Sequence, residues 1–164
     1  MKGLFKRLSI LVASLAMVFG VGLVNNEKNA KAASSETLTV TNFQSDETVK
    51  SKTVALTSCT AIWEQNSSSN AINTTYAQIR LYASHSLTFN INEGYSIQSI
   101  VATATSNSYA NALAGKSLTG ATKSVSGSTV TITPATDATS IVITQSAQSR
   151  ITQFVNNYNA KATQ

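Results

Sequence analysis

The sequence predicts an all-β protein, folded as a single antiparallel β-sandwich of the jelly-roll or immunoglobulin-like kind, on three observations. Apolar and polar residues alternate in many short segments, which is the period of a β-strand. Clusters of Asn, Ser and Gly separate these segments and are typical of turns. About a third of residues 33–164 are Ser or Thr, and Pro134 is the single proline.

The first 32 residues predict a signal peptide that precedes the domain. Lys2, Lys6 and Arg7 provide the positive start, and an uncharged segment rich in Leu, Val and Ala follows over residues 8–24. That segment is short for a membrane span, so a retained anchor is the weaker alternative.

The expected cleavage site is Ala30-Lys31-Ala32, in which Ala30 and Ala32 supply the small residues that signal peptidase reads. Cleavage there leaves one domain, residues 33–164. The length of the leader resembles Gram-positive-type export. We therefore expect a secreted, extracellular protein that makes no membrane contact after cleavage.

The charge and cysteine content exclude several functional classes. Most of the net charge of +5 lies in the leader, and residues 33–164 carry seven basic and six acidic side chains. A nearly neutral domain gives no reason to expect nucleic-acid binding. Cys59 is the only cysteine, so neither a disulfide scaffold nor a Cys/His zinc module is expected. We interpret Cys59 as a small buried residue of a strand.

Strand-like segments follow one another along the domain. They cover residues 38–43, 54–56, 59–63, 79–82, 87–91, 97–104, 125, 130–132 and 141–143. Turn-forming residues separate several of them, and the short link Ala83–Ser86 predicts a hairpin between 79–82 and 87–91.

The final segment allows two interpretations. Ile151, Phe154, Val155 and Tyr158 have the spacing of a helix face. As a strand, the same segment would place Phe154, Asn156 and Tyr158 on one side. Periodicity alone favours the helix.

Several short motifs resemble a poorly characterised family of bacterial secreted β-sandwich modules. They are Tyr76-Ala-Gln-Ile-Arg-Leu-Tyr82, Leu87-Thr-Phe-Asn-Ile91, Ile97-Gln-Ser-Ile-Val-Ala-Thr103 and Ser149-Arg-Ile-Thr-Gln-Phe-Val155 with Tyr158. The resemblance implies a sandwich with a terminal strand and a role in binding or display. Asn156 departs from it, because the family has an apolar residue there.

Catalysis is not expected from these residues. His85 is the only histidine, and no Gly-x-Ser-x-Gly nucleophile motif accompanies it. The six acidic residues of the domain are expected in solvated turns and edges, and no Asp-rich loop suggests bound calcium. We expect neither a metal nor another cofactor.

Carbohydrate binding is the more specific hypothesis. Sugars are held by aromatic rings and by polar groups at the ring edges. Trp63, followed by Glu64, is the first candidate ring, and the alternative is a tryptophan in the core. Tyr82 is expected to face away from its apolar neighbours, and Arg80 could hold an acidic group with two hydrogen bonds.

The sequence therefore predicts a non-catalytic binding module for carbohydrate or cell-surface material such as a cell-wall glycan. The predicted ligand-binding residues are Trp63, Glu64, Arg80 and Tyr82. The alternative is a structural or adhesive protein that self-associates through its strand edges, because strands with few charges are poorly protected against pairing.

Overall fold

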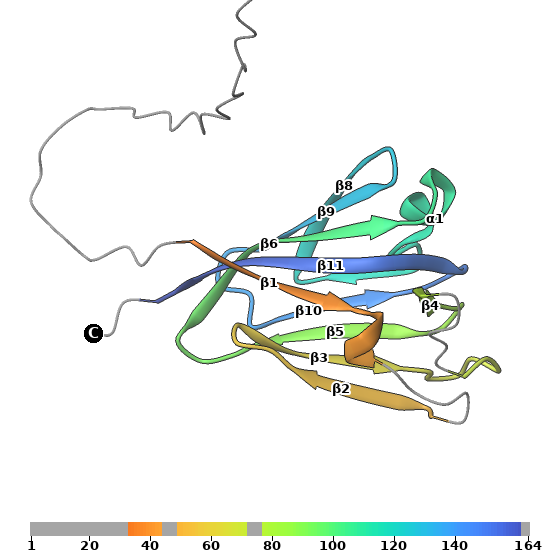
Figure 1. Cartoon of the computed structure of the whole chain (residues 1–164), viewed down its shortest axis with the longest axis horizontal. Coiled ribbons are helices and arrows are strands. Elements are labelled where there is room, and N and C mark those ends of the chain that lie inside the picture. Colours follow the sequence, from red (N-terminus) through yellow and green to blue (C-terminus); the bar gives the residue numbers. More distant parts are fainter. Residues whose placement is uncertain (1–32, 44–48, 72–76, 162–164) are drawn as a thin grey trace, which may run out of the picture.

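The computed structural model describes residues 33–43, 49–71 and 77–161, which form two β-sheets stacked face to face (Figure 1). The predicted leader with Ala30 and Ala32 lies outside the described residues and stays a prediction. The elements in chain order are β1 (Ser34–Thr39), η1 (Val40–Phe43), β2 (Ser51–Ala55), β3 (Cys59–Glu64), β4 (Ile79–Leu81), β5 (Ser86–Ile91), β6 (Tyr95–Ala104), α1 (Asn107–Ala112), β7 (Ser117–Thr119), β8 (Ala121–Ser126), β9 (Thr129–Pro134), β10 (Ser140–Thr144) and β11 (Ser149–Ala160).

All strand pairs in this part of the chain are antiparallel, which confirms the predicted all-β sandwich. The first sheet has the order β1-β11-β6-β9-β8, and β4 also pairs with β11. The second sheet has the order β2-β3-β5-β10-β7. Neither helix of the described residues is long and apolar enough to cross a membrane.

The core lies between the two sheets, where alternate residues of each strand are buried. In β3, Cys59, Ala61 and Trp63 are fully buried, while the residues between them are half-buried. Phe89 of the second sheet meets Phe154 of the first, with ring centroids 5.7 Å apart in an edge-to-face arrangement. Contacts of this kind hold the sheets together, since aromatic pairs add to the free energy gained by burying their surface.

The C-terminal segment is a strand, which confirms the strand interpretation and excludes the helix that periodicity alone favoured. The register of β11 against β6 shifts between Ile151 and Gln153 and again between Asn157 and Tyr158. The first irregularity lets both Ile151 and Phe154 face the core although they are three residues apart. A helix-like spacing therefore arises from a bulged strand.

Two local predictions also differ from the structure. Residues 40–43 form a 3-10 helix instead of continuing the first strand, and this helix buries Phe43. The link Ala83–Ser86 is not a hairpin: β4 pairs with β11 in the first sheet, whereas β5 belongs to the second sheet. The link crosses between the sheets and buries His85.

The short helix α1 was not predicted. Ser106 caps its N-terminus by accepting a hydrogen bond from the Tyr109 backbone N–H. Lys123 of β8 donates its ammonium group to the carbonyl oxygens of Asn111 and Leu113 at the other end. A cation at the C-terminal carbonyls stabilises a helix, so a distant strand fixes this helix in place.

Candidate functional site

The structure corrects the role predicted for Trp63. Its side chain is fully buried, and its ring meets Phe43 edge-to-face with centroids 5.4 Å apart. The indole Nε1–H donates to His85 Nδ1 over 2.9 Å. The ring therefore presents no face to a sugar, and its one polar group already has a partner.

His85 forms the polar end of the core beside Trp63. Because Nδ1 accepts from Trp63, the proton lies on Nε2, which is 2.8 Å from the Asn70 carbonyl oxygen. Burial lowers the pKa of His85 below its ordinary value of 6.5. A neutral imidazole with both nitrogens occupied is a structural connection between β3, β5 and the loop that holds Asn70.

The other predicted site residues do not converge with Trp63. Arg80 lies on β4 of the first sheet and faces away from the core, since its neighbours Ile79 and Leu81 are fully buried. Glu64 ends β3 of the second sheet and faces outward from it. Arg80 and Glu64 thus lie on opposite outer faces of the sandwich.

Tyr82 is half-buried and is the predicted residue nearest to His85. Its ring meets the imidazole edge-to-face, with centroids 5.4 Å apart. The ring packs on the link between the sheets and helps to close that end of the core. The four predicted residues therefore do not form one binding site.

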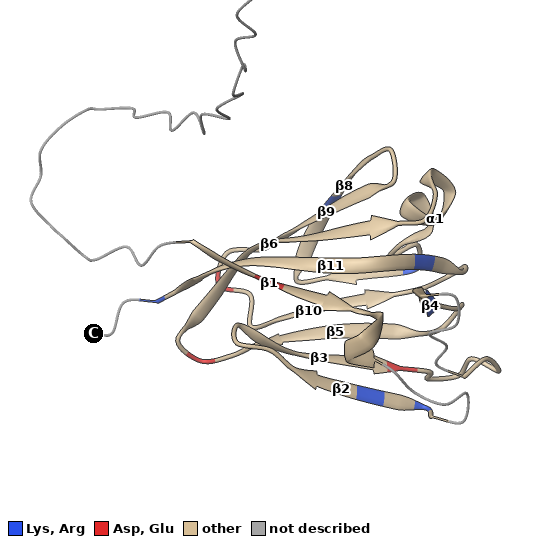
Figure 2. Cartoon of the chain, in the orientation of Figure 1, with Lys and Arg blue, Asp and Glu red and all other residues tan. Residues whose placement is uncertain are grey.

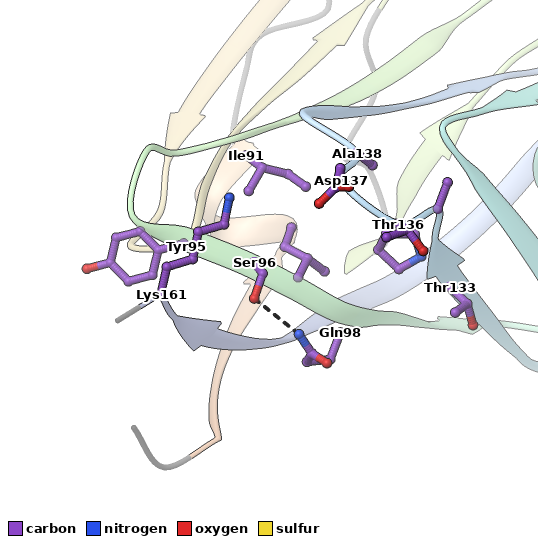
Figure 3. A pocket seen from close by; sticks show the side chains of 12 residues that line it. Ile91, Tyr95, Ser96, Gln98, Thr133, Thr136, Asp137, Ala138 and Lys161 are labelled. Atoms are coloured by element: carbon purple, nitrogen blue, oxygen red, sulfur yellow. Dashed lines mark hydrogen bonds between the residues drawn. The ribbon is translucent and has the colours of Figure 1, made fainter. Parts of the chain in front are cut away.

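A concave site lies at the opposite end of β5, where Ile91 and the β5–β6 turn meet the β9–β10 loop and the end of β11 (Figure 3). We call it the Tyr95 groove. It consists of two adjoining hollows of about 290 and 630 Å³ that share Ile91, Tyr95, Ala138 and Lys161. Its other main lining groups are Glu93, Gln98, Thr133 and Asp137.

The groove forms because β6 and β9 separate. They pair only from Ile100 to Thr103 on β6, although β6 begins at Tyr95. The register shift of β6 against β11 lies near Gln98, where an additional residue bends the strand. Gly94, with φ +79, makes the turn that leads into Tyr95. The diverging half of β6 leaves the hollow beside Pro134 and Ala138.

The side chains of the groove combine one aromatic ring with several polar groups. Tyr95 is half-buried and is held edge-to-face against Tyr158, with centroids 5.7 Å apart. Gln98 donates to the Ser96 hydroxyl over 3.2 Å, which orients its amide (Figure 3). Asp137 and Lys161 contribute opposite charges, and the Lys161 backbone N–H donates to the Gly94 carbonyl over 2.7 Å. A fixed ring, an amide, hydroxyls and charges suit a polar ligand with an apolar face.

The sequence already contained a weak signal for this site. Tyr95 follows the turn Asn92-Glu93-Gly94 directly, and an aromatic residue at the start of a strand lies at the sheet's end. The contributions of Asp137 and Lys161 were not predictable, because they come from separate loops. Among the described residues, no three His, Cys, Asp or Glu side chains gather in a group that could hold a metal ion.

Comparison with family models, with curated proteins and with solved structures finds no match to this chain. The resemblance to a family of secreted modules therefore stays a prediction.

Proposed function

We propose that this protein is a secreted, non-catalytic module that binds carbohydrate, and that the Tyr95 groove is its binding site. The proposal keeps the function predicted from the sequence and moves the site from Trp63 to Tyr95. The secreted location rests on the predicted leader.

The observation that carries the proposal is the half-buried ring of Tyr95 at the edge of a concave, mixed polar site (Figure 3). Tyr158 supports this ring from the side, so its position is fixed before a ligand arrives. A pre-positioned ring loses little conformational entropy on binding. Gln98, Thr133 and Asp137 line the same hollow and provide donors and acceptors for the hydroxyls of a sugar.

The charges of the groove argue against an anionic polymer as the ligand. Glu93 and Asp137 line it together with Lys161, so its formal charge is not positive. The carboxylates that line the groove would repel phosphate or uronic acid groups. An uncharged glycan fits this set of side chains better than nucleic acid does.

Affinity electrophoresis tests the proposal on protein secreted from the full-length sequence. The gels contain hydroxyethyl cellulose, xylan or glycol chitin, and wild type is compared with Tyr95→Ala, Tyr95→Phe and Tyr82→Ala. We expect wild type to be retarded by one of these polymers and Tyr95→Ala to bind it roughly tenfold more weakly.

Tyr95→Phe keeps the ring and should retain most of the binding. Tyr82→Ala removes a ring at the opposite end of the domain and should leave binding unchanged. Circular dichroism checks that each variant is folded. Equal retention of Tyr95→Ala and wild type, or loss in Tyr82→Ala alone, would contradict the proposed site.

Self-association through strand edges is the second candidate function, and the edge strand β8 is the feature that bears on it. This strand is mostly exposed and carries a single charge, Lys123. Lys123 is opposite the buried Ile132, so it points to the inner side, where its ammonium group meets the end of α1. Inward-pointing charges on edge strands discourage pairing with another chain. The geometry of this edge therefore disfavours pairing with a second copy through β8.

A further inference from the structure

The outer side of the β8–β9 hairpin carries a double row of hydroxyl groups. In the antiparallel register, Thr122 faces Thr133, Ser124 faces Thr131 and Ser126 faces Thr129. On β9, the ladder residues alternate with Val130 and Ile132, which are fully buried, so the ladder side chains point away from the core. Their partners on β8 point to the same side, because directly paired residues of antiparallel strands share a face. We call these six residues the hydroxyl ladder.

The hydroxyls of the ladder are available to a ligand. Thr122, Ser124, Ser126 and Thr133 are exposed, and the other two members are half-buried. None of the six side chains has a hydrogen-bond partner among the residues that the structure describes. Three consecutive pairs that use no hydroxyl internally are a surface able to form many hydrogen bonds with a partner.

The ladder is also uncharged and long. β6 and β9 contain no Lys, Arg, Asp or Glu, as Figure 2 shows, and the one charge of β8 lies on its inner side. Alternate residues of a strand are roughly 6.6 Å apart, so Thr129 and Thr133 are separated by about 13 Å. A partner that matches this surface is neutral, extended and rich in hydroxyl groups.

The ladder is continuous with the Tyr95 groove. Thr133 belongs to both: it pairs with Thr122 in the ladder and lines one side of the groove (Figure 3). A chain that occupies the groove can therefore pass from the end of the sandwich onto the outer face of β9 at Thr133. Thr133 lines the smaller hollow, and at about 290 Å³ this hollow alone has room for a short oligosaccharide only, so a longer chain on this side extends along β9.

We propose that the ligand is a linear, uncharged polysaccharide that occupies the Tyr95 groove and runs along the hydroxyl ladder over the β8–β9 hairpin. This inference rests on the proposed function and adds the class and direction of the ligand. The ring of Tyr95 fixes one part of the chain, and the ladder hydroxyls exchange hydrogen bonds with successive sugars. Each such bond contributes little, so the ladder acts through their number.

The test is the dependence of affinity on chain length. Isothermal titration calorimetry uses cello-, xylo- and chito-oligosaccharides from disaccharides to hexasaccharides, with protein secreted from the full-length sequence. Wild type is compared with the double variant Thr131→Val/Ser124→Ala, which removes the central pair of hydroxyls. Thr88→Val is the matched control, since Thr88 is a half-buried outward residue of β5 in the second sheet.

We expect the affinity of wild type for one series to rise with chain length. The double variant should lose about tenfold for the hexasaccharide and little for the disaccharide, because two hydrogen bonds are removed outside the groove. Thr88→Val should behave as wild type. Tm values for all variants separate loss of binding from loss of folding.

Other results overturn the inference in distinguishable ways. If short and long oligosaccharides bind equally well and the double variant binds as wild type does, the ladder takes no part in binding and the groove stays the proposed site. If no oligosaccharide series binds and none of the polymers in the affinity gels retards the protein, both the proposed function and the role of the ladder are contradicted. A dimer that sedimentation detects in wild type and not in the double variant would instead assign the hairpin to a contact with a second copy.

Discussion

Asn156 of β11 donates its side-chain amide to Cys59 Sγ of β3 over 3.1 Å and so connects the two sheets through the core. Both residues are fully buried. Both were unusual in the sequence: Cys59 is the only cysteine, and Asn156 stands where the family that the chain resembles has an apolar residue. The structure explains them together, because each provides the other's partner inside the buried core.

Removing one member of this pair should destabilise the domain. Cys59→Ala leaves the Asn156 amide without an acceptor, and Asn156→Ala adds a cavity, so each variant should lose about 1–3 kcal/mol of unfolding free energy. The double variant Cys59→Ala/Asn156→Ala removes both polar groups and should lose less unfolding free energy than the two single losses added together. Urea unfolding measures all of these values, and strictly additive losses would contradict the pairing.

The thiol of Cys59 should be unreactive in the folded protein. Burial raises its pKa to about 12, so almost no thiolate exists near neutral pH. Ellman's reagent at pH 8 should therefore label the native protein very slowly and the urea-unfolded protein quickly. Labelling of the native protein at the speed of a free thiol would show that Cys59 is accessible.

His85 should make the domain less stable in weak acid. Its folded pKa is lower than 6.5 because of burial, so the unfolded chain takes up the proton first as the pH falls. The contribution of the neutral histidine is complete above about 6.5 and is lost as the pH falls from there towards the folded pKa. Unfolding midpoints between pH 7.5 and 5.5, followed by Trp63 fluorescence, measure this loss.

His85→Gln is the control for that pH dependence. The variant should be less stable at neutral pH, because the glutamine side chain does not replace the packing of the imidazole ring against Trp63 and Tyr82. Its stability should nevertheless change little across the same pH range. A wild-type midpoint that stays constant from pH 7.5 to 5.5 would mean that His85 does not titrate differently in the two states.

Glu36 should contribute more to stability than an ordinary surface carboxylate. Its two oxygens accept from the backbone N–H groups of Thr57 and Ser58 over 2.7 and 3.0 Å, and also from the Ser58 hydroxyl. The carboxylate thereby attaches β1 of the first sheet to the β2–β3 turn of the second. We expect Glu36→Ala to cost about 2–3 kcal/mol, because hydrogen bonds to charged groups are strong.

Glu36→Gln keeps one acceptor oxygen and should cost less than Glu36→Ala. Glu93→Ala removes an exposed turn carboxylate and should change the unfolding free energy little, so it serves as the matched control. Thermal unfolding compares the three variants. Equal, small effects at both positions would show that the Glu36 contacts add no stability.

The sequence predicted the fold class because strand alternation is a local property. Cys59, Ala61 and Trp63 show this alternation clearly, and the structure buries all three. The C-terminal strand was ambiguous because its irregular register places Ile151 and Phe154 on one side, which copies the spacing of a helix. A bulge depends on the neighbouring strand, so periodicity within one segment could not reveal it.

The candidate site was harder to predict, because it depends on contacts between distant segments. Ile62 and Trp63 are both apolar, so alternation alone did not decide which of them faces the core. Tyr95 lies beside a hollow only because β6 leaves β9, and Lys161 reaches it from the far end of the chain. The sequence contained the right types of residue but not their arrangement.

Glycan retention by Tyr95→Ala tests the central claim most directly, with Tyr95→Phe and Tyr82→Ala measured in the same gels. We predict that wild type, Tyr95→Phe and Tyr82→Ala are retarded by the same neutral polymer and that folded Tyr95→Ala is not. Retardation of Tyr95→Ala equal to that of wild type would contradict the assignment of the groove. If no polymer retards wild type and isolated bacterial cell walls do not bind it, carbohydrate binding itself is contradicted.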